Sequence, residues 1–376
     1  MNLSEIVDKT KAYYCLDCGI CTGSCPVSRV TPDFSPRLMV EKCLMEQEEN
    51  PFEDVNIWSC LSCGQCTARC PSRIDYPEFV RRVRAEAVRN GKGGIAAHRG
   101  LFQSIMKLQT LEVKQNKTEW ARQAGKISES GDTYYFVGCS VFFDAEFEAD
   151  WSLDVMDSPR GVLKLLNAVG IEPVIHDDER CCGHDLLWNG DVKNFATLAR
   201  RNVDLIKSLG CKRVVFHCPE GYVTFKKYYP EAVGDLDLEL VHFYELLAGE
   251  LTSGKLGLGA AEGVVTYHDP CRLGRQAGIM DAPRTLLQGI QGLEFREMDH
   301  NRENAICCGT SGWMNCSSCS KEIQKTRIRE AVATGADTLI TSCPKCRLHL
   351  SCALRDMDVE LKIRDINDLL AATLTV

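Results

Sequence analysis

The sequence of 376 residues predicts an α+β fold, in which a helical N-terminal domain precedes a duplicated α/β body. Two compact cysteine runs lie between helical patterns in residues 1–105. A polar stretch at 106–130 follows, and residues 131–255 and 256–376 then repeat one pattern of strands, helices and cysteines. The length is also that of two or three domains. We therefore expect one helical domain and a pair of α/β domains.

The cysteines are the most unusual part of the composition. The chain has 22 of them, whereas its hydrophobic content of 44% and its charged fraction of 26% are ordinary for a globular protein. A chain of this length buries a core without disulfide staples. In a reducing compartment, clustered cysteines indicate metal, cluster or redox chemistry. Adjacent cysteines such as Cys181-Cys182 also do not suit a disulfide framework.

Charge and hydropathy argue against several classes of protein. The net charge of −8 argues against a nucleic-acid backbone as the main partner. No apolar stretch approaches the roughly 18–20 residues of a membrane-spanning helix. The first residues carry Glu5 and Asp8, where a signal peptide would need a basic end and an apolar run. We therefore expect a soluble, cytoplasmic protein without a membrane span.

The N-terminal domain contains two matching cysteine runs. Each has the spacing C-x-x-C-x-x-C-x-x-x-C-P, which is the pattern of two-cluster ferredoxins, where the fourth cysteine of each run binds the other cluster. Gly19 and Gly64 allow the backbone to pass close to inorganic sulfide. We expect two [4Fe–4S] cubane clusters, one held by Cys15, Cys18, Cys21 and Cys70 and the other by Cys60, Cys63, Cys66 and Cys25.

The segments around these runs are predicted to be helical. Residues 36–45 form a helical pattern that begins at a proline, and residues 76–90 form a second one. Cys43 lies in the first of these helices and is interpreted as a core thiol rather than a ligand. The whole arrangement resembles the α-helical ferredoxin module of the succinate dehydrogenase and heterodisulfide reductase families.

Residues 106–130 are interpreted as a linker. Between Lys107 and Lys126 there are five basic residues and two acidic ones, which is typical of a linker or of a solvated helix face. Docking of a partner is the alternative interpretation of this basic stretch.

The rest of the chain is an internal repeat. A helical segment in each half ends at a glycine, Gly210 or Gly335, eight residues before a cysteine. Alternation of strand, helix and strand with a glycine stop predicts parallel α/β units, here a pseudo-twofold pair. The expected strands are 134–137, 214–216, 264–267 and 338–341. The repeated cysteines are Cys139 with Cys271, Cys181 and Cys182 with Cys307 and Cys308, and Cys218 with Cys343.

These cysteines are expected at the carboxyl ends of parallel strands, where open α/β sheets usually bind their ligands. The first half has four of them, and Gly221 stands where a fifth is expected by comparison with the second half. Five thiolates exceed the four of a tetrahedral zinc site or an ordinary cubane cluster. Two adjacent cysteines do not easily bind two corners of one cubane, but they can bind different irons of a distorted or opened cluster. The five cysteines of the second half are Cys271, Cys307, Cys308, Cys343 and Cys346.

On these residues both halves resemble the "CCG" domains of the B-type polypeptide of heterodisulfide reductase, which are named for their Cys-Cys-Gly motif. The ferredoxin part resembles the C-type polypeptide, so that nearly the whole chain resembles their fusion, the D type. The resemblance implies that the five cysteines of the second half hold a noncubane [4Fe–4S] cluster and are catalytic. It also implies that a disulfide is cleaved between two such clusters. For Cys139, Cys181, Cys182 and Cys218 the alternatives are a four-thiolate cluster, a zinc site or an empty site.

The resemblance implies an electron-transfer enzyme. Electrons would enter from a flavin-containing partner similar to the A-type polypeptide of heterodisulfide reductase, pass two cubane clusters, and reduce a disulfide or thiol substrate at one or two noncubane clusters. The alternative is a non-catalytic relay component of a flavin-dependent 2-hydroxyacid or glycerol-3-phosphate dehydrogenase complex, because such components are built from the same two parts. The glycine-rich residues 254–263 lack a nucleotide fingerprint, so we expect no flavin site in this chain.

Several side chains near the motifs have two interpretations. Cys316 and Cys319 form an extra C-x-x-C, which suits a redox dithiol or spare ligands. Cys211 and Cys352 are interpreted as buried thiols. Three histidines are either proton donors to a leaving thiolate or satisfied structural residues: His184, His217 and His268.

Overall fold

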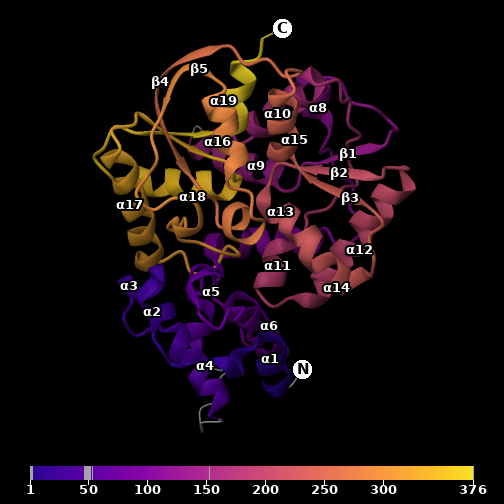
Figure 1. Ribbon diagram of the computed structural model, residues 1–376. Helices are drawn as coiled ribbons and strands as arrows, with labels where there is room; N and C mark the ends of the chain where they lie inside the picture. Colours follow the sequence, from indigo (N-terminus) through magenta and orange to yellow (C-terminus); the bar gives the residue numbers. More distant parts are fainter. Residues whose placement is uncertain (1–2, 46–51, 53, 152, 376) are drawn as a thin grey trace.

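The computed structural model describes residues 3–45, 52, 54–151 and 153–375. In this part of the chain the N-terminal domain contains helices and no strands, and it lies at the bottom of Figure 1. The helices expected at 36–45 and 76–90 are present, each with a proline in its first turn and a capping side chain, Ser35 or Asp75. The elements are α1 (Leu3–Thr10), α2 (Ile20–Ser24), α3 (Pro26–Val30), α4 (Pro36–Leu44), α5 (Gln65–Arg69) and α6 (Tyr76–Arg89).

The first α/β half is built on a parallel sheet in the order β1-β2-β3. Its strands are β1 (Thr133–Phe136), β2 (Arg213–Phe216) and β3 (Glu239–His242). Its helices are α9 (Ser140–Trp151), α10 (Asp157–Ala168), α11 (His184–Trp188), α12 (Val192–Ser208), α13 (Pro219–Val223), α14 (Tyr229–Val233) and α15 (Phe243–Thr252).

The second half has a parallel sheet in the order β5-β4-β6-β7, so that β4 and β6 lie side by side as β1 and β2 do. The duplicated α/β prediction is therefore confirmed. Its strands are β4 (Ala260–His268), β5 (Gln291–Phe295), β6 (Thr338–Thr341) and β7 (Lys362–Asp365). Its helices are α16 (Asp281–Gln288), α17 (Ser318–Ala333), α18 (Pro344–Leu354) and α19 (Ile366–Ala372).

The two halves join through paired helices. Helix α10 of the first half packs on α19 of the second, and α15 packs on α16, so each half contributes to both pairs (Figure 1). Gly161 allows the first of these contacts, because a Cβ there would lie 2.5 Å from the carbonyl oxygen of Asn367. The two halves therefore pack into one body, and this packing positions the carboxyl ends of one sheet relative to those of the other.

The segment expected as a linker packs against the first half. It contains α7 (Leu101–Leu108) and α8 (Glu119–Ala124). The Lys117 ammonium is buried and lies 2.8 Å from the carboxylate of Glu179. The Gln109 side chain accepts a hydrogen bond from the backbone N–H of Cys181. The domain limits drawn around residues 106–130 stay a prediction, but these contacts tie the segment to the cysteine pair of the first half.

The N-terminal domain is docked on both halves. The guanidinium of Arg84 in α6 is fully buried and donates to the carbonyl oxygens of Trp188 in the first half and of Cys60 in its own domain. On the other side, Val27 and Phe34 share a buried cluster with Ile323 of α17. Within the described residues, no helix has the length and apolar character that a membrane span requires.

Candidate metal centres

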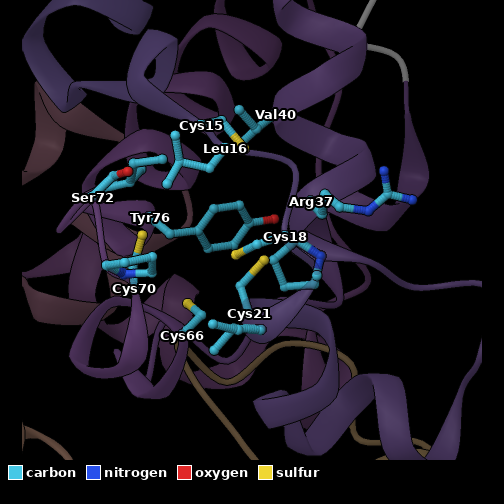
Figure 2. A pocket seen from close by; sticks show the side chains of 15 residues that line it. Cys15, Leu16, Cys18, Cys21, Arg37, Val40, Cys66, Cys70, Ser72 and Tyr76 are labelled. Carbon is cyan, nitrogen blue, oxygen red and sulfur yellow. The ribbon is translucent and has the colours of Figure 1, made fainter.

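The first cavity of interest lies in the N-terminal domain and is lined by cysteines (Figure 2). Gly19 precedes α2 with φ +75°, a conformation that favours glycine, and this turn brings the loop before α2 toward the residue that ends α5. A set of four thiolates suits a [4Fe–4S] cluster. The cysteines brought together here are the four that the spacing assigns to one cubane, with Cys66 beside them: Cys15, Cys18, Cys21 and Cys70.

A second group of thiols is more deeply buried. Cys25 lies within electrostatic reach of Cys63 and Cys60, and burial, with these two charges, raises the pKa of its thiol to about 12. Burial and the same neighbours raise the pKa of Cys66. Gly64 repeats the turn of Gly19 with φ +77°. Thiols in such surroundings carry charge when they are bound to a metal, so this donor set also fits a cubane cluster.

Tyr76 was missed as a site residue by the sequence reasoning, which treats it only as the start of a helix. Its ring lies among the labelled cysteines of Figure 2, and its buried hydroxyl has no hydrogen-bond partner among the described residues. Burial, together with the charges of Cys60 and Cys66, raises its pKa far above the usual value. A protonated hydroxyl between two cysteine sets is suited to donate to sulfur.

The first half brings its four cysteines to one cavity. The cavity lies at the carboxyl ends of β1 and β2, and the Sγ atoms of Cys139 and Cys181 are 2.8 Å apart. Gly221 also lines it, and a Cβ at this position would lie 3.5 Å from Phe216 and 3.9 Å from Phe136. The place of the fifth thiol is therefore open but faces an aromatic wall. The gathered cysteines are Cys139, Cys181, Cys182 and Cys218.

The five cysteines of the second half form a continuous chain of thiol contacts. Gly309 has φ +81°, and a Cβ there would lie 2.7 Å from the carbonyl oxygen of Ser320, so the Cys-Cys-Gly turn packs tightly against α17. A donor set with a fifth thiolate fits a cluster with more attachment points than a cubane. The contacts join Cys271 to Cys307, Cys307 to Cys308, Cys308 to Cys346, and Cys346 to Cys343.

His268 is part of the second site. Its ring lies within 4.8 Å of the sulfur atoms of Cys308 and Cys346. The Nε–H of Arg327 donates to His268 Nδ1 at 3.1 Å, which places the histidine proton on Nε2. Burial lowers the pKa of His268, so the ring is neutral and its Nε2–H is available to Cys308. The corresponding residue of the first half is Phe136, three residues before Cys139.

A buried charge network closes the first site. Lys345 extends from the start of α18 in the second half into the first cavity, where it pairs with Asp185 and, at 2.5 Å, with Glu220. These carboxylates, against the effect of burial, raise the pKa of Lys345 well above its usual value. The network thus places a permanent positive charge beside the four thiols.

The other two histidines are held by neighbours on at least one ring nitrogen. His184 lies 2.8 Å from Asp185 through Nδ1, while its Nε2 accepts from Arg272. His217 lies 2.9 Å from the hydroxyl of Tyr135 through Nδ1, and burial lowers its pKa to about 3. The assignment of these histidines as proton donors stays a prediction.

The ferredoxin loop touches the second site directly. Cys63 forms a thiol contact with Cys307, and this contact, followed by the charges of Arg275 and Arg272, lowers the pKa of Cys63 to about 6. Arg275 Nε donates to the carbonyl oxygen of Cys63 at 2.8 Å, and Arg272 Nη1 donates to that of Ser62 at 2.6 Å. Both arginines follow Cys271, so one short segment carries an expected cluster ligand and binds the loop that contains Ser62 and Cys63.

The remaining cysteines belong to none of the expected ligand sets. Cys43 and Cys211 are buried, as expected, and burial raises the pKa of Cys43 to about 12. Cys352, expected to be buried, is only half-buried. Cys316 and Cys319 line two different cavities.

Comparison with known families agrees with this layout. Residues 133–226 and 265–351 each match the model of the CCG cysteine-rich domain. Residues 11–74 match the model of a 4Fe-4S dicluster domain. The two duplicated halves and the ferredoxin part therefore correspond to separate, recognised domain types.

Individual relatives share the same parts. The D polypeptide of the dihydromethanophenazine:CoB–CoM heterodisulfide reductase of Methanosarcina mazei is 31% identical over 269 residues, which is 69% of this chain and 63% of that protein. The B polypeptide of the fumarate reductase (CoM/CoB) of Methanothermobacter marburgensis is 27% identical, covering 96% of this chain and 72% of its own length. The EtfAB:quinone oxidoreductase of Syntrophomonas wolfei is also 27% identical, covering 67% of this chain and 38% of its own length. The chain thus spans less than two thirds of its heterodisulfide reductase relative.

Among solved structures, a hypothetical protein from Helicobacter pylori matches with a TM-score of 0.57 over 99% of this chain and 76% of that one. At 11% identity this likeness supports the fold alone. With its dicluster domain and two cysteine-rich domains, the chain belongs to the CCG-domain iron–sulfur oxidoreductases similar to the D polypeptide of heterodisulfide reductase.

Proposed function

We propose that this chain is the iron–sulfur component of a complex that carries electrons from a flavoprotein partner to its second CCG site and there reduces a disulfide. The bound clusters would supply one-electron carriers in series, two cubanes in the N-terminal domain and a noncubane cluster on the five cysteines. The chain's own residues would hold these carriers close together and prepare the site of reduction.

The contact between Cys63 and Cys307 carries this proposal. It joins a cysteine assigned to the second cubane to one assigned to the noncubane site, so that electrons have a short path between the two groups. Arg275 holds the two ends of this path together. It donates hydrogen bonds to the carbonyl oxygen of Cys63 and to that of Ala305, which lies two residues before Cys307. Both cysteines are buried, and water is therefore kept from the path.

The surface around the first cubane site suits the entry of electrons. Cys18 is exposed there, and Leu16 beside it exposes 68% of its surface. Contiguous exposed apolar side chains mark partner contacts. A flavoprotein that docks on this face would meet the cluster at its most accessible cysteine. Among the described residues of the N-terminal domain, the exposed large apolar residues are Tyr13, Tyr14, Leu16, Ile20, Leu38, Leu44, Met45, Val55 and Ile95.

At the second site the chain's residues prepare the reduction. Splitting a disulfide into two thiols consumes two electrons and two protons. Arg327 holds His268 in the tautomer that directs its Nε2–H toward Cys308, which stabilises negative charge on sulfur as electrons arrive. Lys345 lies between Cys343 and Cys346 at the start of α18, but its ammonium points away from the second site and into the cavity of the first site.

The test distinguishes the entry of electrons from the flavoprotein from their transfer to the second CCG site. In a Tyr13→Asp, Leu38→Asp variant, which changes exposed side chains outside the cavity lining, we expect the flavoprotein partner to reduce the clusters about tenfold more slowly, with iron content unchanged. In Cys63→Ala, we expect reduction of the first cubane to persist while electrons no longer reach the second site. Loss of the noncubane signal in Cys63→Ala, with the second cubane intact, would contradict the assignment.

A relay protein without its own substrate is the second candidate, and two observations favour it. The fifth thiol of the first site is missing at Gly221, and the similarity extends to a quinone oxidoreductase whose name indicates no sulfur substrate. In a relay, the reduced protein would pass its electrons to another component of the complex. Mixing the reduced chain alone with a small disulfide distinguishes the two, because only the reductase oxidises its clusters and releases thiol.

A further inference from the structure

A small cavity adjoins the second CCG site. Thr310 and His349 belong to its wall; the first follows Cys308-Gly309, and the second lies one turn after Cys346 on α18. Trp313 and Trp151 supply an aromatic wall. Two cysteines outside every assigned ligand set complete the lining: Cys316 and Cys352.

The two thiols face one cavity although they are far apart in sequence. Cys316 is exposed in the loop before α17, and Cys352 lies in the last turn of α18, which packs against α17. The ammonium of Lys321 lies 2.8 Å from Cys352 Sγ. Burial and then the charge of Cys352 raise the pKa of Cys316, while Lys321 opposes this effect. One lysine therefore acts on both sulfur atoms.

The C-x-x-C spacing points to a different pair, Cys316 with Cys319, whose members line different cavities. Cys316 precedes α17, whereas Cys319 lies in its first turn and lines a cavity with Leu61 and Cys60 of the N-terminal domain. The pairing of Cys316 with Cys352 thus depends on the packing of two helices and cannot be seen in the sequence.

We propose that Cys352 and Cys316 are a thiol–disulfide exchange pair that receives a small organic disulfide beside the second CCG site. Cys352 is the attacking thiol, because its sulfur accepts a hydrogen bond from the ammonium of Lys321 at 2.8 Å. Cys316 is the resolving thiol, because its raised pKa keeps it protonated until the mixed disulfide has formed. Cys316 is exposed and Cys352 is half-buried, so a disulfide reaches the pair from the protein surface, beside the aromatic side chains of Trp151 and Trp313.

The chemistry balances in two exchanges. Cys352 sulfur attacks one sulfur of the disulfide, a bond forms between them, and the other half leaves as a thiol with a proton. Cys316 then attacks Cys352, releases the second thiol, and leaves a Cys316–Cys352 disulfide. The substrate has gained two electrons, and the protein dithiol has lost them. Two electrons and two protons restore the dithiol; this step alone rests on the proposed function, through the path that ends at Cys307.

The exchange is tested on the anaerobic holoprotein without partner or electron donor. The protein is incubated with glutathione disulfide, its free thiols are trapped by alkylation, and its peptides are mapped by mass spectrometry. We expect a Cys316–Cys352 crosslink in the wild type, and a glutathione adduct on Cys352 in Cys316→Ser. In Lys321→Met the adduct should form about tenfold more slowly. The matched control Cys319→Ser should behave as the wild type.

Three results would overturn the proposal. These are a Cys316–Cys319 crosslink, an adduct on Cys316 but none on Cys352, and full alkylation of both cysteines. The wild-type map needs no variant, so it decides even if a substitution disturbs folding. If the crosslink forms but reduced clusters do not reopen it, then the electron path of the proposed function fails while the exchange pair stands.

Discussion

The two CCG sites descend from one repeat but differ at matched positions. Both bring cysteines to the carboxyl ends of neighbouring parallel strands, after β1 and β2 in the first half and after β4 and β6 in the second. Where the second has Cys346, the first has Gly221. Where the second has a neutral His268 facing sulfur, the first has Phe136. The second site thus has both an extra thiolate and a hydrogen-bond donor.

The sites also differ in their surroundings. The second site touches the ferredoxin loop through Cys63, whereas the first receives Lys345 from across the interface and pairs it with its own Asp185 and Glu220. Duplication therefore produced two pockets on one scaffold, of which one contacts the ferredoxin loop at Cys63 and the other is closed by ion pairs. We infer that the second is the redox centre and that the first supports it.

The largest effect is expected from Cys346→Gly, which gives the second site the thiol count of the first. Turnover with a disulfide should fall by on the order of 100-fold, since a ligand to the reacting group is lost. Steady-state activity, together with iron analysis, measures this. Cys211→Ser, which removes a buried thiol outside every site, is the control and should keep full activity. Equal activity in both variants would remove the distinction between the sites.

Breaking the grip on the ferredoxin loop should have an intermediate effect. Arg275→Met removes hydrogen bonds to the carbonyl oxygens of Cys63 and Ala305 without touching a cysteine. We expect electrons to reach the second site about tenfold more slowly, which corresponds to roughly 1.4 kcal/mol in the barrier. Rapid-mixing spectroscopy measures the delay, with Arg329→Met on the surface of α17 as control. Unchanged kinetics would mean that electrons take another path.

Replacing His268 by Phe copies the wall of the first site and removes the Nε2–H directed at Cys308. The potential of the second site should fall by on the order of 60 mV, a tenfold change for one electron. His268→Gln retains an N–H donor and should recover part of the shift. A spectroscopic redox titration provides the values, and an unchanged potential in His268→Phe would show that the histidine only fills space.

The smallest effect on turnover is expected from Gly221→Cys. Its Cβ has room at 3.5 Å from Phe216, so the first site acquires five thiols without a backbone change. Iron should rise from about 12 per chain toward about 16, at four irons per cluster. Turnover should stay within about twofold, because the path still ends at Cys307. A large gain in turnover would instead indicate that two complete sites act together.

Much of the difference between the two sites could be predicted from the sequence, because short-range spacing determines it. The cysteine runs, the strands before Cys139 and Cys271, and the absence of a thiol at Gly221 are local patterns. Strands β3, β5 and β7 were missed, since they carry no motif to mark them. Pairs such as Arg327 with His268, or Lys345 with Glu220, also have no local signal, because they form only when distant elements pack.

The same limit applies to the choice of a thiol pair. Spacing joins Cys316 to Cys319, but the start of α17 lies between them, so they line different cavities. Residues 106–130 show a related effect of packing. Their charge suggests solvent, yet Lys117 is buried against Glu179 once the first half has folded. Composition describes a segment, whereas burial depends on its neighbours.

The claim that only the second CCG site is the redox centre is tested most directly by electron paramagnetic resonance. Anaerobic protein is titrated with and without a small thiol such as 2-mercaptoethanol, in the wild type, in Cys346→Gly and in Cys182→Ser. We predict one thiol-dependent signal, which is retained in Cys182→Ser and lost in Cys346→Gly. A signal lost in Cys182→Ser and retained in Cys346→Gly would contradict this claim and assign the chemistry to the first site.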